Sequence, residues 1–261
     1  MESQTSSRLG ARAVPTRELL SLRTRFRAEM ACQIVHDSIP DRPGWTVDYL
    51  LESDSLPAGF GTMAVAGPWK DRPTILEFYV LPEHQQAAFG LFEVFLTASG
   101  ARLLEVQTSN SLLTIMLHLH GQEVASEKIV FADGVTTSHP ANGASLVAST
   151  PEAEVLAALE RRQGGGEWQL RLGDEVLGSG GILFHYNRPY GDIYMDIAEP
   201  YRRRGWGTLL VQELKRICYG LGAVPCARCN TENTASRRTL VRAGFLPCAH
   251  ILNARIARTP A

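Results

Sequence analysis

The chain has 261 residues, of which 44% are hydrophobic, and its 26 basic side chains against 27 acidic ones leave a formal net charge of -1. This length fits one large domain or two ordinary ones, and the apolar content is sufficient for a buried core. The balanced charge excludes a global positive field of the kind that draws a protein to nucleic acid or to a membrane surface.

The start of the chain and its cysteines indicate a compartment. The segment MESQTSSRLGARAVPTRELL has no apolar core of signal-peptide length, and no stretch reaches the roughly 18 apolar residues of a membrane span. The five cysteines are too few and too scattered for a disulfide framework, which agrees with a reducing environment. We therefore expect a cytoplasmic protein with no membrane and no nucleic-acid partner.

The predicted elements of the second half begin with a helix. In STPEAEVLAALERRQGGG, Thr150 is a candidate N-cap, Pro151 takes the first helical position, and glycines follow the end. WQLRLGDEVLGSGGILFHY then predicts two strands around a tight turn at Gly173-Asp174. GDIYMDIAEP predicts a third strand, which Pro200 closes.

An amphipathic helix follows after a short basic turn. From Thr208 onward apolar residues recur at helical spacing, and Gly220 and Gly222 supply the stop. AVPCARCN is typical of a strand that ends at Asn230, and NTASRRTLVRAGF of a short helix that ends at Gly244. The predicted order is helix, hairpin, strand, helix, strand, helix, strand.

Cys226 and Cys229 on the predicted strand form a Cys-x-x-Cys pattern. A zinc site would need a second pair of ligands, and a thioredoxin-like site would need the motif to open a helix. We interpret both residues as core thiols and expect no metal.

The basic turn RRRGWG, Arg202–Gly207, lies where the third strand runs directly into the helix. Successive backbone N–H groups there point outward, with the positive end of the helix dipole behind them. Gly205 and Gly207 lack the Cβ atoms that would keep an anion from the backbone, and arginines can add charge-assisted contacts to phosphate oxygens. The turn therefore suits a pyrophosphate. The alternative is that the arginines form a solvated face.

Two motifs resemble a known family. Arg202-x-x-Gly205-x-Gly207, between a strand and an amphipathic helix, resembles the acyl-CoA pyrophosphate loop of the GNAT superfamily of N-acetyltransferases. Glu232–Phe245 resembles the family's late segment, in which an Asn is followed three positions on by a small residue and Gly-Phe closes the helix. Both motifs occur in family order and at family spacing.

The resemblance implies acetyl-CoA as the co-substrate. The end of the third strand, near Ile197 and Ala198, would splay from its neighbour and hydrogen-bond the pantetheine arm, and the loop from Arg202 to Thr208 would hold the pyrophosphate. Trp206, between the two glycines, is interpreted as a packing residue of this loop. The residues expected at the cofactor are Ile197, Ala198, Arg202, Arg203, Arg204, Gly205, Trp206, Gly207, Thr208, Asn233 and Ser236.

The reaction needs a base, because an amine attacks only when it is neutral. Alternation along GDIYMDIAEP places Asp192, Tyr194 and Asp196 on one face, provided that the family's strand bulge does not shift the register. Asp196 is the first candidate because it lies closer to Ala198, where the thioester is expected, and Asp192 is the second. The alternative is that both are exposed strand residues or turn caps.

The general acid stays open. In many family members a tyrosine lies seven residues after the motif's Asn and protonates the leaving thiolate, but here that position is Leu240. A thiol with a pKa of about 8.5 is a tolerable leaving group without such help.

The first half of the chain resembles the second. YVLPEHQQAAFGLFEVFL aligns with DIAEPYRRRGWGTLLVQEL, so that Gln85 falls on Arg202, Ala88 on Gly205 and Gly90 on Gly207. Ala88 places a methyl group where the backbone must approach an anion, and no arginine or lysine occurs between Glu83 and Arg102. We interpret this copy as degenerate, and the alternative is a second functional acyl-CoA site.

The sequence therefore predicts an α/β (α+β) chain of two tandem GNAT-like domains, each a mixed, mostly antiparallel sheet flanked by helices. Residues 1–138 would form the degenerate, non-catalytic domain, with a linker within Asp133–Ser145, and residues 139–261 the catalytic one.

The predicted activity is transfer of an acetyl group from acetyl-CoA to an amine by direct attack, without a metal. The acceptor is a small-molecule or peptide amine whose identity the sequence does not give, and the oligomeric state is equally open. The alternative is a pseudoenzyme that binds acyl-CoA and reports it to a partner without turnover. A transferase that uses charged tRNA is disfavoured by the intact loop and by the lack of a basic surface.

Overall fold

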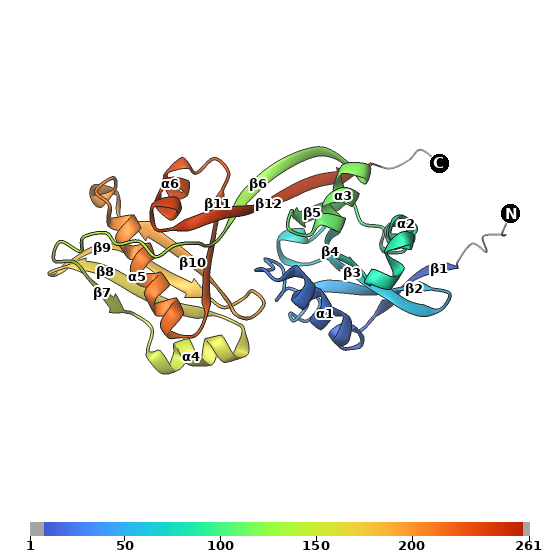
Figure 1. Ribbon diagram of the computed structural model, residues 1–261, viewed down its shortest axis with the longest axis horizontal. Coiled ribbons are helices and arrows are strands. Elements are labelled where there is room, and N and C mark those ends of the chain that lie inside the picture. Colours follow the sequence, from blue (N-terminus) through green and yellow to red (C-terminus); the bar gives the residue numbers. More distant parts are fainter. Residues whose placement is uncertain (1–7, 258–261) are drawn as a thin grey trace. The chain divides into compact units, whose positions relative to one another are not determined.

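The computed structural model describes residues 8–257, which form two compact units (Figure 1). The first unit contains the described residues up to Ala31, then Ile39–Ser126 and the chain from Ile251 onward. The second contains Cys32–Ser38 and Glu127–His250. The predicted boundary after residue 138 follows the sequence repeat, whereas each of these units also takes a segment from the other half of the sequence.

The first unit is a mixed sheet with the strand order β1-β2-β3-β4-β5-β12, in which only β4 and β5 are parallel. Its strands are β1 (Leu9–Val14), β2 (Thr46–Ser53), β3 (Leu56–Ala64), β4 (Thr74–Val80), β5 (Leu103–Gln107) and the distal part of β12 (Phe245–Ile256). Its helices are α1 (Leu20–Met30), α2 (Ala88–Ser99) and α3 (Ser111–His120), with 3₁₀ turns η1 (Thr16–Leu19), η2 (Gly67–Trp69) and η3 (Pro82–Ala87).

The second unit repeats this arrangement with the strand order β6-β11-β10-β9-β8-β7, in which only β10 and β11 are parallel. Its strands are β6 (Gly121–Asp133), β7 (Ser145–Ala148), β8 (Gly165–Leu172), β9 (Glu175–Leu183), β10 (Tyr190–Ile197) and β11 (Val224–Asn230). Its helices are α4 (Glu152–Arg161), α5 (Trp206–Gly220) and α6 (Thr234–Arg242), with the 3₁₀ turn η4 (Glu199–Tyr201). Each unit thus has six strands in a mixed, mostly antiparallel arrangement flanked by helices, which confirms the predicted fold class.

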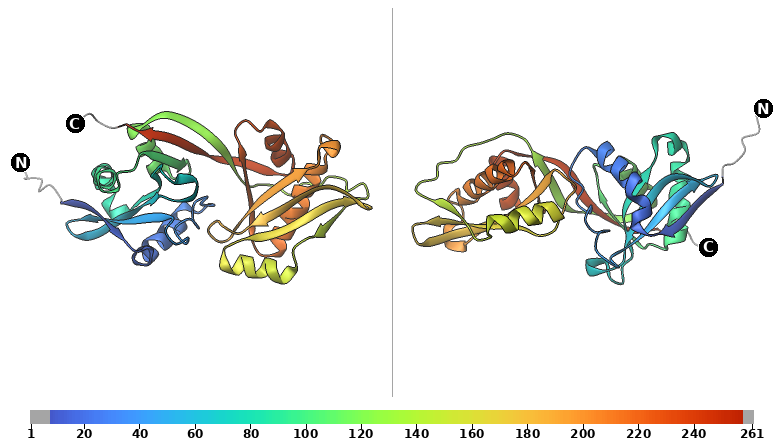
Figure 2. Two further views of the ribbon diagram at one scale, coloured as in Figure 1. Left: turned by 180° about the vertical axis from the view of Figure 1, so that it is seen from behind. Right: turned by 90° about the horizontal axis from the view of Figure 1, so that it is seen from below.

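The last strand of each repeat completes the other sheet. Strand β6 follows α3 but pairs with β11, and β12 follows α6 but pairs with β5 through Ile251–Arg255. Both strands are long, and both can be followed in the two views of Figure 2. This exchange explains why neither unit is a continuous stretch of sequence.

Local predictions in the second half are largely confirmed. The hairpin turns at Gly173-Asp174, β11 ends at Asn230, and α5 begins at Trp206, two residues before the expected start at Thr208. The predicted cap of the first helix is wrong by one residue. Pro151 is the N-cap of α4, and the hydroxyl of Thr150 instead accepts a hydrogen bond from the backbone N–H of Glu167.

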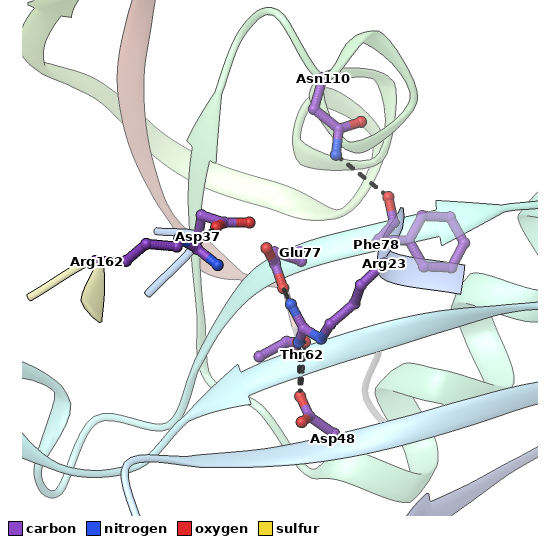
Figure 3. Close-up of polar contacts among 8 residues, drawn as sticks. All are labelled: Arg23, Asp37, Asp48, Thr62, Glu77, Phe78, Asn110 and Arg162. Carbon is purple, nitrogen blue, oxygen red and sulfur yellow. Dashed lines mark hydrogen bonds and ion pairs between the residues drawn. The ribbon is translucent and has the colours of Figure 1, made fainter. Parts of the chain in front are cut away.

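A buried ion cluster fixes α1 on the first sheet. The Arg23 guanidinium donates to Glu77 at 2.8 Å, to Asp48 at 3.0 Å and to the Thr62 hydroxyl at 2.7 Å (Figure 3). Two buried carboxylates against this arginine raise its pKa in spite of the burial that opposes its charge. The cluster fixes the position of α1, because the Arg23 guanidinium joins the helix to side chains of β2, β3 and β4.

In the second unit the helices α4 and α5 pack on the same face of the sheet. Val155 and Ala158 of α4 and Leu210 and Leu214 of α5 belong to one core cluster with Trp168, Leu170, Ile182 and Ile193. The opposite face carries Asp192, Tyr194 and Asp196, because side chains alternate along β10 and its pairing with β9 runs without a bulge. The three residues thus share one face of β10, as the sequence predicted.

Candidate functional site

Strand β10 separates from β11 part way along its length. Their parallel pairing runs from Tyr190 opposite Val224 to Ile193 opposite Ala227, whereas β10 stays paired with β9 as far as Ile197. The sequence placed the opening near Ile197 and Ala198, and it begins earlier, after Ile193. The two parallel strands thus leave a wedge along the last half of β10.

The backbone groups that face this wedge follow from strand alternation. The N–H of Ala198 donates to the carbonyl of Leu177 at 3.0 Å, so the amide of Ala198 points toward β9. In a strand, the backbone N–H and C=O groups of successive residues point toward opposite neighbouring strands. Those of Met195 and Ile197 therefore point away from β9 and toward the wedge. The expectation for Ile197 is compatible with this geometry. That for Ala198 is not, because its N–H is already used.

The turn before α5 forms an open cradle of backbone N–H groups. Gly205 precedes the helix at φ +90°, and Arg203 has φ +62°. In the described chain, none of the five successive N–H groups of Arg203–Gly207 donates a hydrogen bond, while those of Thr208 and Leu209 both donate to the Gly205 carbonyl. Free backbone N–H groups at a helix N-terminus, in a turn that alternates between negative and positive φ angles, form an arrangement that binds anions.

The arginines of this turn differ in their surroundings. Arg202 folds back on β10, where its Nε donates to the Ile197 carbonyl at 2.7 Å and its guanidinium lies 3.4 Å from Asp196. Arg203 and Arg204 are exposed, and neither forms an ion pair with residues 8–257. Trp206 packs against the core of the unit, and Thr208 is buried. Two of the three arginines are therefore available to an anion in the cradle.

The linker after β6 reaches this cradle, which the sequence did not indicate. Buried Lys215 of α5 binds Asp133 at 2.9 Å and the Val135 carbonyl at 3.0 Å, and the Thr137 hydroxyl accepts a hydrogen bond from Gln212. The linker follows α5 to the ring of His139, which lies over Gly205, so that a Cβ at residue 205 would be only 2.3 Å from the imidazole Nε2. The linker is thus bound to α5, and it places the imidazole of His139 beside the turn at Gly205.

The late motif forms the start of α6. Asn233 is the N-cap, and its side-chain oxygen accepts the backbone N–H of Ser236 at 2.9 Å. This leaves the Asn233 amide NH₂ for another partner. Leu240 is buried in the core of the unit, so this position supplies no acid.

The equivalent turn of the first unit, as far as the structure describes it, has no such cradle. There η3 runs directly into α2, Ala88 has an ordinary helical φ of −56°, and its N–H donates to the Gln85 carbonyl. The Asn110 side-chain NH₂ donates to the Phe78 carbonyl on β4 at 3.2 Å (Figure 3), which fills the edge where β4 leaves β5. Groups that are open in the second unit are therefore used internally in the first.

The two candidate bases have contrasting environments. The Asp196 side chain is 78% exposed and its partner is Arg202. The Asp192 side chain is 6% exposed, and one of its oxygens lies 3.3 Å from His185 Nε2 and 3.4 Å from Arg228 Nε. Sequence analysis missed His185 and Arg228 because they lie in a loop and on the next strand, where only the fold brings them to Asp192.

The cysteine pair lies on β11 as predicted. Cys226 and Cys229 are both buried. Burial raises the pKa of the Cys226 thiol well above its ordinary value, and raises that of Cys229 too, so both thiols are poor nucleophiles. Between residues 8 and 257 no three His, Cys, Asp or Glu side chains gather as a metal site, and no helix there is long and apolar enough to cross a membrane.

Comparison with known proteins agrees with this geometry. The model of the acetyltransferase (GNAT) family matches residues 139–245. A GNAT-family acetyltransferase from Colwellia psychrerythraea has the same fold, with a TM-score of 0.70 at 14% identity over 95% of this chain and 100% of that one. A search of curated proteins by sequence gave no match.

Two further structures share the fold over nearly the whole chain. A tandem GNAT protein from the clavulanic acid biosynthesis pathway has a TM-score of 0.62 at 12% identity, over 98% of this chain and 100% of that one. A GCN5-related N-acetyltransferase from Sphaerobacter thermophilus has a TM-score of 0.58 at 16% identity, over 96% of each. Residues 139–245 thus match the acetyltransferase (GNAT) family, and the whole chain has the fold of solved GNAT proteins, one of which is a tandem form.

Proposed function

We propose that the second unit binds acetyl-CoA and transfers its acetyl group to an amine by direct attack. The observation that carries this proposal is the run of five unused backbone N–H groups at Arg203–Gly207, placed at the end of a strand whose edge is open. The match of residues 139–245 to the acetyltransferase (GNAT) family model supports the same proposal.

In this proposal each part of the site has one task. The cradle holds the pyrophosphate, with charge-assisted contacts from Arg203 and Arg204. The wedge-facing backbone groups of Met195 and the N–H of Ile197, whose carbonyl already accepts from Arg202, hydrogen-bond the amides of the pantetheine arm, and the NH₂ of Asn233 is free for the cofactor. Gly207 keeps the helix close to β10, since a Cβ there would be 3.5 Å from Ile197.

Acetyl transfer then requires a polarised thioester carbonyl, a base and a leaving group. A wedge-facing backbone N–H polarises the thioester carbonyl, in the manner of an oxyanion hole. A base on the face that carries Asp192 and Asp196 takes the proton of the ammonium. No metal has a role. The CoA thiolate leaves without an acid at Leu240, because a thiol pKa of about 8.5 makes it an adequate leaving group.

We further propose that catalysis is confined to residues 139–261 and that the repeat in residues 1–138 is non-catalytic. The internal hydrogen bonds of Ala88 and Asn110 support this division. Free cysteines throughout the described chain support a cytoplasmic location. The acceptor is a small-molecule or peptide amine.

Release of the CoA thiol from acetyl-CoA over a panel of small-molecule and peptide amines tests the proposal. We expect at least one amine to stimulate release, and we expect Arg203→Ala together with Arg204→Ala to raise the KM for acetyl-CoA. Cys248 is exposed, so a protein blank corrects the thiol signal.

The second candidate function is that of an acyl-CoA-binding pseudoenzyme, and Leu240 in place of the family's tyrosine favours it. It predicts tight acetyl-CoA binding without release on any acceptor. That outcome would overturn the transferase proposal and keep the binding site.

A further inference from the structure

We propose that His185 is the general base of the second unit and that Asp192 positions it. This inference rests on the proposed function. It assigns proton acceptance to the imidazole of His185 instead of to the carboxylate of Asp192 or Asp196.

The pair places an imidazole nitrogen beside a buried carboxylate. His185 Nε2 lies 3.3 Å from Asp192 Oδ2, and the Asp192 side chain is only 6% exposed. Nε2 is buried and makes no hydrogen bond within residues 8–257, so Asp192 holds it by charge and proximity at 3.3 Å, whereas Nδ1 is not among the buried polar atoms without a partner. The His185 side chain is 17% exposed. Nδ1 is therefore the nitrogen that can accept a proton from a substrate.

The position of the pair relates it to the wedge. Asp192 precedes Ile193, the last residue of β10 that pairs with β11. Met195, whose backbone faces the wedge, lies three residues further along, which is about 10 Å of strand. Asp192 projects from the face of the sheet opposite α4 and α5, and its contact with His185 places the imidazole on that side, away from the helix layer.

The loop that carries His185 is held firmly. The Asn187 side chain accepts the backbone N–H of Ile34 at 2.6 Å and donates to the Cys32 carbonyl at 3.0 Å. Arg188 donates to the Glu160 carbonyl at the end of α4 at 3.1 Å. These bonds tie the loop to two other segments of the unit, and a base that must meet a substrate nitrogen needs such support.

The charged and titratable neighbours of His185 come from three elements. Asp192 is on β10, Arg228 and Cys226 are on β11, and the ring of Tyr186 packs edge-on against His185 at 4.4 Å. Burial, with Asp192 nearby, raises the pKa of the Tyr186 phenol, and burial raises that of the Cys226 thiol, so both stay neutral. Arg228 and His185 both lie within 3.4 Å of the same Asp192 oxygen, so the charge of the arginine offsets that of the carboxylate beside the imidazole.

The reaction balances with this base. Nδ1 of His185 takes one proton from the ammonium, and the freed lone pair forms the C–N bond to the thioester carbon. The C–S bond breaks, and its electron pair leaves on the CoA sulfur. The nitrogen loses a second proton as the amide forms. One of the two protons ends on the sulfur, and the other passes to solvent when His185 is deprotonated again.

The test compares His185→Gln and Asp192→Asn with His118→Gln, an exposed histidine on α3, using an amine found in the panel. For His185→Gln we expect kcat to fall by about 10²-fold or more, while the Kd for acetyl-CoA stays at the parental value. The acidic limb of the parental kcat/KM profile should disappear in this variant. Added imidazole should restore part of the activity of His185→Ala, and His118→Gln should match the parent.

Asp192→Asn separates positioning from proton transfer. We expect a smaller loss of kcat and an acidic limb displaced to lower pH, because the carboxylate that stabilises the imidazolium is gone. Parental kcat and an unchanged acidic limb in His185→Gln would overturn the inference and leave the transferase proposal standing. So would loss of acetyl-CoA binding in that variant without rescue by imidazole, which gives His185 a structural role. A parent that releases no thiol with any amine would contradict the proposed function itself and this inference with it.

Discussion

Gly205 has the backbone conformation on which the anion cradle depends. At φ +90°, a residue with a Cβ is strained by about 1–2 kcal/mol, and the new methyl group would also meet His139. The sequence motif identified this glycine only because a residue without a Cβ lets an anion reach the backbone. The structure adds that it also ends the turn and lies under the linker.

We predict that Gly205→Ala weakens acetyl-CoA binding by about tenfold or more, because the N–H groups can no longer converge. Titration calorimetry measures the Kd, and circular dichroism checks that the fold survives. Gly220→Ala is the matched control, since Gly220 lies at the other end of α5 with nothing within 4 Å of an added Cβ. Equal affinity of the Gly205 variant and the parent would rule out the cradle as the pyrophosphate site.

Asp196 was the first candidate for the base, and its surroundings now favour another role. It is exposed, and it pairs with Arg202 at the end of β10. Because an exposed ion pair contributes little, we predict that Asp196→Asn keeps kcat within about threefold of the parent and leaves the acidic limb in place. Steady-state acetylation across pH measures both. A loss of about 10²-fold with unchanged acetyl-CoA affinity would instead make Asp196 the base.

Among the elements, α5 organises the second unit. Its N-terminus forms the cradle, its apolar side packs on β9 and β10, and its buried Lys215 holds the linker. The Lys215 side chain is 3% exposed, and it donates to the Ala243 carbonyl at 3.2 Å as well as to Asp133 and Val135. A single lysine thus joins the linker, α5 and the end of α6.

Replacement of this lysine should be costly. We predict that Lys215→Met lowers the free energy of unfolding by about 3 kcal/mol, because Asp133 keeps only the Tyr219 hydroxyl as a partner among the described residues and the carbonyls of Val135 and Ala243 lose the lysine donor. Chemical denaturation followed by circular dichroism measures this. Lys128→Met is the control, since its pair with Glu127 is partly exposed and should contribute no more than about 1 kcal/mol. Similar effects of the two substitutions would contradict the proposed clamp.

Elements with local signals were predictable from the sequence, and their partners were not. The helical spacing after Thr208 and the Gly173-Asp174 turn depend on residues that are close in sequence, and both are confirmed. The pairing of β6 with β11 has no local signal, since a strand's apolar pattern does not name its neighbour. The contacts of His185, Arg228 and His139 could not be predicted either, because they join residues that only the fold brings together.

For the whole molecule, the exchange of strands links the stability of the two repeats. The second unit needs β6 beside β11 and the segment Cys32–Ser38, whose Asp37 pairs with Arg162 at the end of α4 (Figure 3). A chain of residues 139–261 would lack both and would expose the β11 edge from Cys226 to Asn230.

We predict that residues 139–261 alone form no stable monomer, although they contain the whole family match. Size-exclusion chromatography and thermal unfolding compare this chain with the full protein, and residues 121–261, which regain β6, serve as the intermediate control. Cooperative unfolding of the short chain at the parental Tm would show that the exchanged segments are dispensable.

We propose that this tandem chain has one acyl-CoA site, in its second unit. Calorimetric titration of the full chain with acetyl-CoA tests it most directly. We predict one site per chain, because the N–H groups that are open at Arg203–Gly207 are used internally where Ala88 begins α2. Two sites of similar affinity would contradict the degenerate first copy, and no binding at all would contradict the acyl-CoA site itself.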